Sequence, residues 1–187
     1  PKKWLTGEVL DAYMSLLQTR ADKEMKKFKF FPTHFYQILQ KQDNVVNMQL
    51  PYVKDEDILL WDKLFFPINQ KGEHWVMVMV DVRKGELQFY DPLPRAEERG
   101  EVEMYTVQMF LFNLAAVRTQ SSLDVGAWRK VGMDDIPTQP DQFNCGVYVV
   151  LYADLISQGV ELSIREGQPL SIRPEELPYL RKKIVVD

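Results

Sequence analysis

The chain has 187 residues, of which 45% are hydrophobic and 27% are charged, the balance of an ordinary globular protein with one sizeable core. Its net charge of −4 argues against a nucleic-acid partner, because nucleic-acid-binding proteins usually carry a basic surface. No apolar run approaches the roughly 20 residues that cross a bilayer and no signal peptide opens the chain, so we expect no membrane partner. We expect one domain over residues 1–187, excised from a longer protein because the sequence starts without a Met.

The side chains that most often bind metals are scarce in this sequence. A single Cys excludes an internal disulfide, and neither of the two His residues stands at a metal-site spacing from another ligand. The glycine-rich motifs that bind nucleotides are absent, and so is the Gly-x-Ser-x-Gly motif of serine hydrolases. We therefore expect neither a metal nor a cofactor.

The first predicted element is a helix over residues 5–18, with Thr6 as its cap. Apolar residues at helical spacing predict its buried face: Leu5, Val9, Ala12, Tyr13, Leu16 and Leu17. A second buried segment covers residues 30–39 and is rich in aromatic side chains. Residues 43–57 are polar and are predicted to form a loop.

Three strands are predicted next, over residues 63–68, 75–80 and 86–90. The middle strand is apolar at every position, which indicates a central strand buried on both faces. Lys84 and Gly85 are predicted to form a two-residue turn, so the last two strands would make an antiparallel hairpin.

The second half of the chain is mainly helical in pattern. A charged loop over residues 92–101 leads to helical spacing over 103–117, and a short strand is predicted at 127–131. Residues 145–157 are nearly all apolar, which predicts a buried central helix, and a charged helix follows Pro174. A helix, then a run of strands, then further helices indicates an α+β fold.

His74 and Asp91 are the first candidates for chemistry. His74 stands just before the central strand and Asp91 ends the strand that returns beside it, so the hairpin brings both to the same end of the sheet. With a two-residue turn Asp91 would face Val78, four residues from His74, and a bulge or bend would have to close the gap. From this feature alone, a His at a strand start followed by Trp is more often structural than catalytic.

Cys145 is the second candidate, because it follows a polar loop and opens the apolar helix. The positive end of the helix dipole favours a thiolate at such a position. Gly146 beside it would allow a substrate backbone to approach closely. The alternative is an inert, buried Cys.

Gln139 stands six residues before Cys145 and could donate its amide N–H to a tetrahedral oxyanion, with the backbone N–H of Cys145 as second donor. Gln142 competes for the same role. His34 has no acidic or Cys partner at a telling spacing and is predicted to be structural.

Taken together, the order His74, Asp91, Gln139, Cys145 resembles the Ulp/SENP family of SUMO-specific cysteine proteases. The resemblance lies in the strings Gly-Glu-His-Trp, Leu-Gln-Phe-Tyr-Asp and Asn-Cys-Gly-Val-Tyr, and in the opening Trp-Leu-Thr-Gly-Glu-Val-Leu. It extends over nearly the whole chain. The chain departs from the family pattern before the nucleophile, where Phe-Asn stands in place of the frequent Ser-Asp.

This resemblance implies a papain-like α+β fold in which helices flank a central mixed sheet and the nucleophile lies at the N-terminus of a buried central helix. It implies a triad of Cys145, His74 and Asp91, with Gln139 as oxyanion donor. It also implies that Trp4 and Trp75 wall a channel that admits only glycine.

The implied substrate is a ubiquitin-like modifier, SUMO first, which is cleaved after its C-terminal Gly-Gly in conjugates or in precursors. A NEDD8-type or ubiquitin specificity, an acyltransferase and a non-catalytic modifier-binding module stay open as alternatives. The family further implies a monomer in the nucleus or the cytoplasm.

Overall fold

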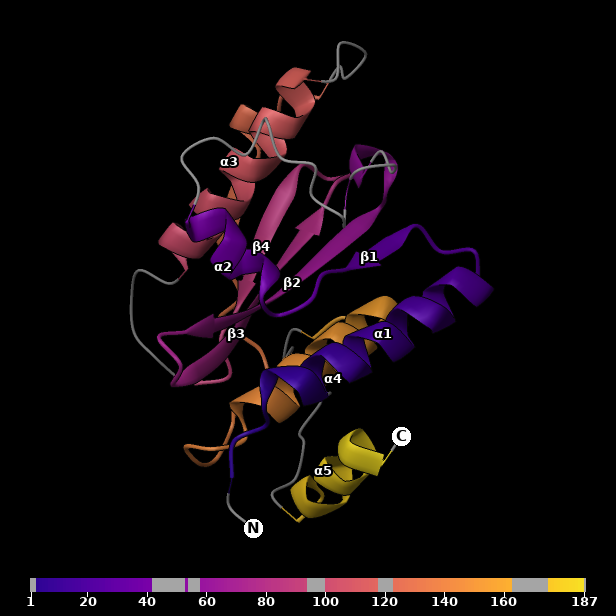
Figure 1. Cartoon of the computed structure of the whole chain (residues 1–187), viewed down its shortest axis with the longest axis vertical. Helices are drawn as coiled ribbons and strands as arrows, with labels where there is room; N and C mark the ends of the chain where they lie inside the picture. The colour runs from indigo at the N-terminus through magenta and orange to yellow at the C-terminus, as the bar shows by residue number, and fades with distance from the viewer. Residues whose placement is uncertain are drawn as a thin grey trace.

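The computed structural model describes residues 3–41, 53, 58–93, 100–117, 123–162 and 175–186, and at its centre lies a five-stranded sheet (Figure 1). The strands, in their order across the sheet, are β1 (Phe28–Phe30), β2 (Lys63–Gln70), β3 (His74–Asp81), β4 (Glu86–Tyr90) and β5 (Arg129–Gly132). The two inner pairs are antiparallel and the two outer pairs are parallel. The mixed sheet that the family resemblance implies is thereby confirmed.

Helices cover both faces of this sheet (Figure 1). On one side lie α1 (Gly7–Lys23), α4 (Cys145–Ser157) and α5 (Leu177–Val186), and on the other lie α2 (Phe35–Gln40) and α3 (Glu101–Val117). Short 3₁₀ helices stand at Ile58–Leu60 and Val125–Ala127. The α+β class and the bounds of the predicted helix over 145–157 are confirmed, whereas the predicted loops over 43–57 and 92–101 lie mostly outside the described residues.

Strand β3 is buried on both faces, as its unbroken apolar sequence predicts. Successive side chains of a strand point to opposite faces, and here each face has its own core. Met77 and Met79 pack into the core beneath α1 and α4. Val76, Val78 and Val80 pack into the core beneath α2 and α3.

Helix α1 differs from the prediction in its length and in the face that it buries. Thr6 occupies the N-cap position, as predicted, but its side chain makes no capping hydrogen bond. Leu16, predicted to be buried, is 44% exposed, whereas Leu10 and Met14 are buried in the core. Neighbouring Leu residues at 16 and 17 fit either of two overlapping faces, and packing against the sheet and α4 selects the one that contains Leu17.

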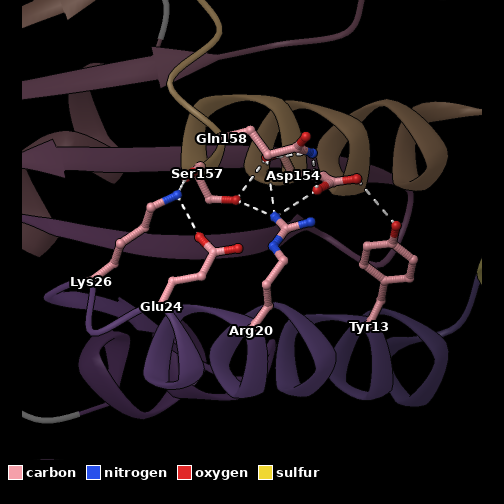
Figure 2. A network of polar contacts seen from close by, with 7 residues as sticks. All are labelled: Tyr13, Arg20, Glu24, Lys26, Asp154, Ser157 and Gln158. Atoms are coloured by element: carbon pink, nitrogen blue, oxygen red, sulfur yellow. Dashed lines mark hydrogen bonds and ion pairs between the residues drawn. The ribbon is translucent and has the colours of Figure 1, made fainter.

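Polar contacts hold α1 beside the C-terminal half of α4 (Figure 2). Arg20 Nη2 lies 2.7 Å from Asp154 Oδ1 and donates to Ser157 Oγ at 2.6 Å. Lys26 Nζ donates to the Ser157 carbonyl at 3.0 Å, and the Tyr13 hydroxyl donates to Asp154 Oδ2 at 3.4 Å. We call these contacts the clamp between α1 and α4. Because α4 begins at Cys145, the clamp also fixes the position of α1 relative to the nucleophile candidate.

Candidate active site

The hairpin of β3 and β4 brings His74 and Asp91 together in a register that differs from the predicted one. Val78 pairs with Phe89 and not with Asp91, because four residues rather than two connect the strands. Continuing this register places Asp91 opposite Val76, two residues from His74, where the predicted register had placed it four residues away. The predicted bulge is therefore not needed, since the longer turn itself shortens the offset.

A buried hydrogen bond joins the two side chains. His74 Nε2 lies 2.7 Å from Asp91 Oδ1, and the two residues are 8% and 5% exposed. Asp91 Oδ1 also accepts the backbone N–H of Leu93 at 2.9 Å, which holds the carboxylate in place. This arrangement engages Nε2 and leaves Nδ1 for the Cys145 thiol, which is the ring's other hydrogen-bonding neighbour.

The charge of the His74 ring depends on these two neighbours. Burial disfavours the charged form and, by itself, lowers the pKa of His74. The hydrogen bonds to Asp91 and Cys145, together with the charges of both groups, act in the opposite direction and prevail, so the pKa of His74 rises from 6.5 to about 9. At neutral pH the ring is therefore an imidazolium between two groups that stabilise it.

Cys145 is the first residue of α4, as predicted, and its thiol is free. It is only 1% exposed. The first N–H groups of a helix have no carbonyl within the helix to donate to, so the N–H of Cys145 lies outside the helical ladder. A helix start, a thiol and an imidazolium thus meet at one point, although they come from α4 and from the β3–β4 hairpin.

Gln139 lies in the loop that leads to α4 and is 5% exposed, whereas its competitor Gln142 is exposed at the surface. The backbone N–H of Gln139 donates to the Pro92 carbonyl at 2.7 Å, which ties this loop to the segment after Asp91. Its side-chain Nε2 donates to the Asp141 carbonyl, and its Oε1 is buried without a hydrogen-bond partner among the described residues. Burial beside the segment that follows Asp91 favours Gln139 over the exposed Gln142.

Trp4 and Trp75 both bind backbone carbonyls near the start of α4. Trp4 is 47% exposed, and its Nε1 donates to the Gln142 carbonyl at 3.0 Å. Trp75 is buried, and its Nε1 donates to the Leu5 carbonyl at 3.0 Å. The Trp4 indole therefore ties the segment before α1 to the loop before α4, and the Trp75 indole ties the same segment to β3.

Gly146 has a packing role that the sequence did not suggest. A Cβ built at this position would lie 3.1 Å from Leu5 Cβ, 3.2 Å from Trp75 Cδ1 and 3.3 Å from Leu10 Cδ1. The groups that approach this glycine closely are thus side chains of the protein itself. Its contact with a substrate stays a prediction.

Three polar residues of the site were not predicted from the sequence. Asp141 Oδ1 accepts the backbone N–H groups of Phe143 and Asn144, each at 3.0 Å, and so shapes the turn before Cys145. Asn144 is 4% exposed, and its Oδ1 accepts from Arg181 Nη1 of α5 at 2.7 Å. An Asp three residues before an Asn at a helix start is typical of such a turn and was an available signal, but no local pattern points to Arg181.

The remaining sequence candidates lie apart from this site. His34 occupies the N-cap position of α2, across the sheet from α4. Within the described part of the chain, no three His, Cys, Asp or Glu side chains are grouped so that they could hold a metal ion. Nor does any described helix have the length and apolar character that crossing a membrane requires.

Comparison with known proteins decides the family. Residues 3–187 match the Ulp1 protease family, C-terminal catalytic domain. The chain belongs to this family. The resemblance drawn from the sequence is thereby confirmed, and the enzyme class that it implied, a cysteine protease, is that of the Ulp1 family.

Individual relatives agree with this assignment. The chain is 28% identical to ubiquitin-like-specific protease 1A of Arabidopsis thaliana and 26% identical to sentrin-specific protease 2 of Homo sapiens. These matches cover 98% and 97% of this chain, but the chain spans only 36% and 29% of those relatives' own lengths.

The fold of the family is confirmed by a solved structure, that of the C-terminal Ulp1 protease domain in complex with Smt3, the yeast ortholog of SUMO. It superposes with a TM-score of 0.73 at 19% identity, and the match covers 99% of this chain and 76% of that one. The papain-like arrangement expected for the Ulp type, with Cys145 at the start of the buried helix α4, is therefore correct.

Proposed function

We propose that this protein is a cysteine peptidase that cleaves after the C-terminal Gly-Gly of a ubiquitin-like modifier, with SUMO as the first candidate. The observation that carries the proposal is the 2.7 Å contact between His74 and Asp91, with the Cys145 thiol as the other hydrogen-bonding neighbour of His74. Such a nucleophile, base and orienting acid from three chain segments form a catalytic triad. Isopeptide bonds in conjugates and peptide bonds in precursors are both candidate substrates.

The proposed reaction has two stages. The Cys145 thiolate attacks the carbonyl carbon of the terminal glycine, and Gln139 Nε2 and the Cys145 N–H donate to the oxyanion that forms. His74, held by Asp91, gives its proton to the leaving amine as the C–N bond breaks and a thioester remains. Water, which gives one proton to His74, then attacks the thioester carbon. The C–S bond breaks to release the Cys145 thiolate and the modifier's terminal carboxyl group, whose remaining proton passes to solvent.

The burial of the nucleophile supports a diglycine substrate. With Cys145 only 1% exposed, a chain that reaches the sulfur must be thin and unbranched, and glycine is the one residue without a Cβ. Trp4 lies in the segment that leads to α1, Trp75 donates to the Leu5 carbonyl of the same segment, and the two are proposed as the walls of this channel. Flat aromatic walls supply contact area with little side-chain entropy to lose.

The names of the relatives support the choice of modifier. Relatives in Arabidopsis thaliana and Homo sapiens are named ubiquitin-like-specific and sentrin-specific proteases, and the solved Ulp1 domain is bound to a SUMO ortholog. The proposed partners are therefore SUMO and its conjugates, and neither a nucleic acid nor a membrane is proposed. We place the protein, as a monomer, in the nucleus or the cytoplasm, where reducing conditions keep a catalytic Cys active.

Turnover of a SUMO C-terminal coumarin amide tests the assignment of roles. Cys145→Ala should lower the rate by at least about a thousandfold while SUMO binding persists, because only the nucleophile is lost. Gln139→Ala should lower kcat about 10²–10³-fold with little change in KM. The exposed neighbour offers a matched control, since Gln142→Ala should retain wild-type kcat. Wild-type turnover by Cys145→Ala would refute the proposed mechanism, and equal losses at 139 and 142 would refute the role of Gln139.

A further inference from the structure

Asn144 occupies the N-cap position of α4 but does not cap the helix. Asn is among the preferred N-cap residues because its side-chain oxygen usually accepts an N–H from the first turn. Here the Asn144 side chain makes no capping hydrogen bond. The N–H groups of Gly146 and Val147, at the second and third positions of α4, are therefore not engaged by the side chain that would ordinarily bind one of them.

The Asn144 amide instead links two charged residues. Its Nδ2 donates to Asp141 Oδ2 at 2.5 Å, and its Oδ1 accepts from Arg181 Nη1 at 2.7 Å. Asp141, Asn144 and Arg181 thus form a continuous chain from the loop before the nucleophile to the C-terminal helix α5. Asn144 is 4% exposed, so the amide has little access to water as an alternative partner.

Both ends of this chain reach residues with a proposed catalytic or channel role. At one end, the Asp141 carbonyl accepts from Nε2 of Gln139, the proposed oxyanion donor. At the other end, Arg181 Nη2 donates to the Lys3 carbonyl, next to Trp4. The Trp4 indole in turn donates to the Gln142 carbonyl at 3.0 Å, inside the same loop.

We propose that Asp141, Asn144 and Arg181 are positioning residues. They orient the Gln139 amide and the start of α4 for the reaction, and they fix the backbone at Lys3, next to Trp4, beside them. The proposal rests on the function proposed above and adds that α5, through Arg181, helps to position the groups of the active site.

The contact between residues 141 and 144 requires a carboxylate on one side and an amide on the other. Asp141 has only acceptor oxygens and receives three N–H groups, so its partner at 144 must supply a donor as well as an acceptor for Arg181. An Asp at 144 would set two carboxylates against each other at a 2.5 Å contact. With an Asn at 141, the backbone N–H groups hold its Oδ1, so its own NH₂ group would face the NH₂ group of Asn144. Exchanging the two residue types restores a donor facing an acceptor and gives Arg181 a charged partner.

A double-mutant cycle tests the link with Asn144→Asp, Asp141→Asn and the exchanged pair Asp141→Asn/Asn144→Asp. Each single variant should lower kcat about tenfold with KM within about threefold, and the exchanged pair should return kcat to within about threefold of wild type. Thermal midpoints measured by circular dichroism ensure that each assay runs on folded protein. If the added charge alone governed the rate, the two single variants would change kcat in opposite directions, and that result would overturn the proposal. An exchanged pair no faster than the slower single variant would overturn it too.

Arg181→Gln provides a second test, which leaves the residues of the loop before α4 unchanged. It should lower kcat about tenfold and also raise KM, because the guanidinium holds both Asn144 and the carbonyl before Trp4. Its matched control is Lys182→Gln, which removes the same charge from an exposed neighbouring residue and should keep kcat. Unchanged kinetics in Arg181→Gln would refute the role of α5. Failure of the wild-type protein to cleave any modifier would instead refute the proposed function, so the two failures can be told apart.

Discussion

The protonation of His74 links the pH dependence of the site to Asp91. The pKa of His74 is raised to about 9, mainly through the hydrogen bonds of Asp91 and Cys145 acting against burial. A raised pKa means that the protonated ring stabilises the fold: this contribution is complete below about pH 6.5 and is lost as the pH rises through about 9. The imidazolium that is proposed to protonate the leaving amine disappears over the same range.

We predict that kcat/KM falls above about pH 9 and that Asp91→Asn moves this alkaline limb to lower pH while lowering the rate at least a hundredfold. The reason is that Asn removes the charge that favours the imidazolium and alters its hydrogen bond. A pH profile of kcat/KM measures both effects. The control is Glu73→Gln, next to His74 in sequence but exposed, where solvent screens the lost charge and the limb should stay in place. An alkaline limb that stays near pH 9 in Asp91→Asn would contradict the role assigned to Asp91.

At the scale of elements, the clamp between α1 and α4 makes a prediction about stability (Figure 2). Arg20 and Arg83 both form ion pairs at nearly the same distance, 2.7 Å to Asp154 and 2.6 Å to Asp62. The Arg20 side chain is 34% exposed and also donates to Ser157, whereas the Arg83 side chain is 74% exposed. Arg20→Gln should therefore cost about 1–2 kcal/mol of unfolding free energy, and Arg83→Gln less than about 0.5 kcal/mol. Urea denaturation measures the two, and equal losses would mean that the clamp contributes no more than a surface ion pair.

Elements with one dominant pattern could be predicted from the sequence, and those decided by packing could not. Residues 75–80 are apolar throughout and residues 145–157 are nearly all apolar, so their burial depends little on which face is chosen. The buried face of α1 and the β3–β4 register each had two near-equal solutions, and contacts with other elements selected one. The register error was harmless to the pairing of His74 with Asp91 because a shift of two residues keeps both on one face.

The site shows the same division. The positions of Cys145, His74 and Asp91 follow from a helix start and a hairpin end, which local sequence marks. The polar chain through Asn144 to Arg181 joins residues 37 positions apart, and only the packing of α5 against the start of α4 brings them together. From the sequence, Asn144 is only a departure from the family pattern. The structure shows that its side chain donates to Asp141 and accepts from Arg181.

For the molecule as a whole, we propose that Cys145 attacks the carbonyl at the C-terminus of a ubiquitin-like modifier. The most direct measurement exposes the protein to SUMO, a NEDD8-type modifier and ubiquitin, each with an electrophile in place of its terminal carboxylate, and identifies the adduct by mass spectrometry. We expect a covalent adduct with SUMO at Cys145 that Cys145→Ala abolishes. Preferred capture of ubiquitin or the NEDD8-type modifier would reassign the substrate, and binding of SUMO with no adduct at Cys145 would refute Cys145 as the nucleophile.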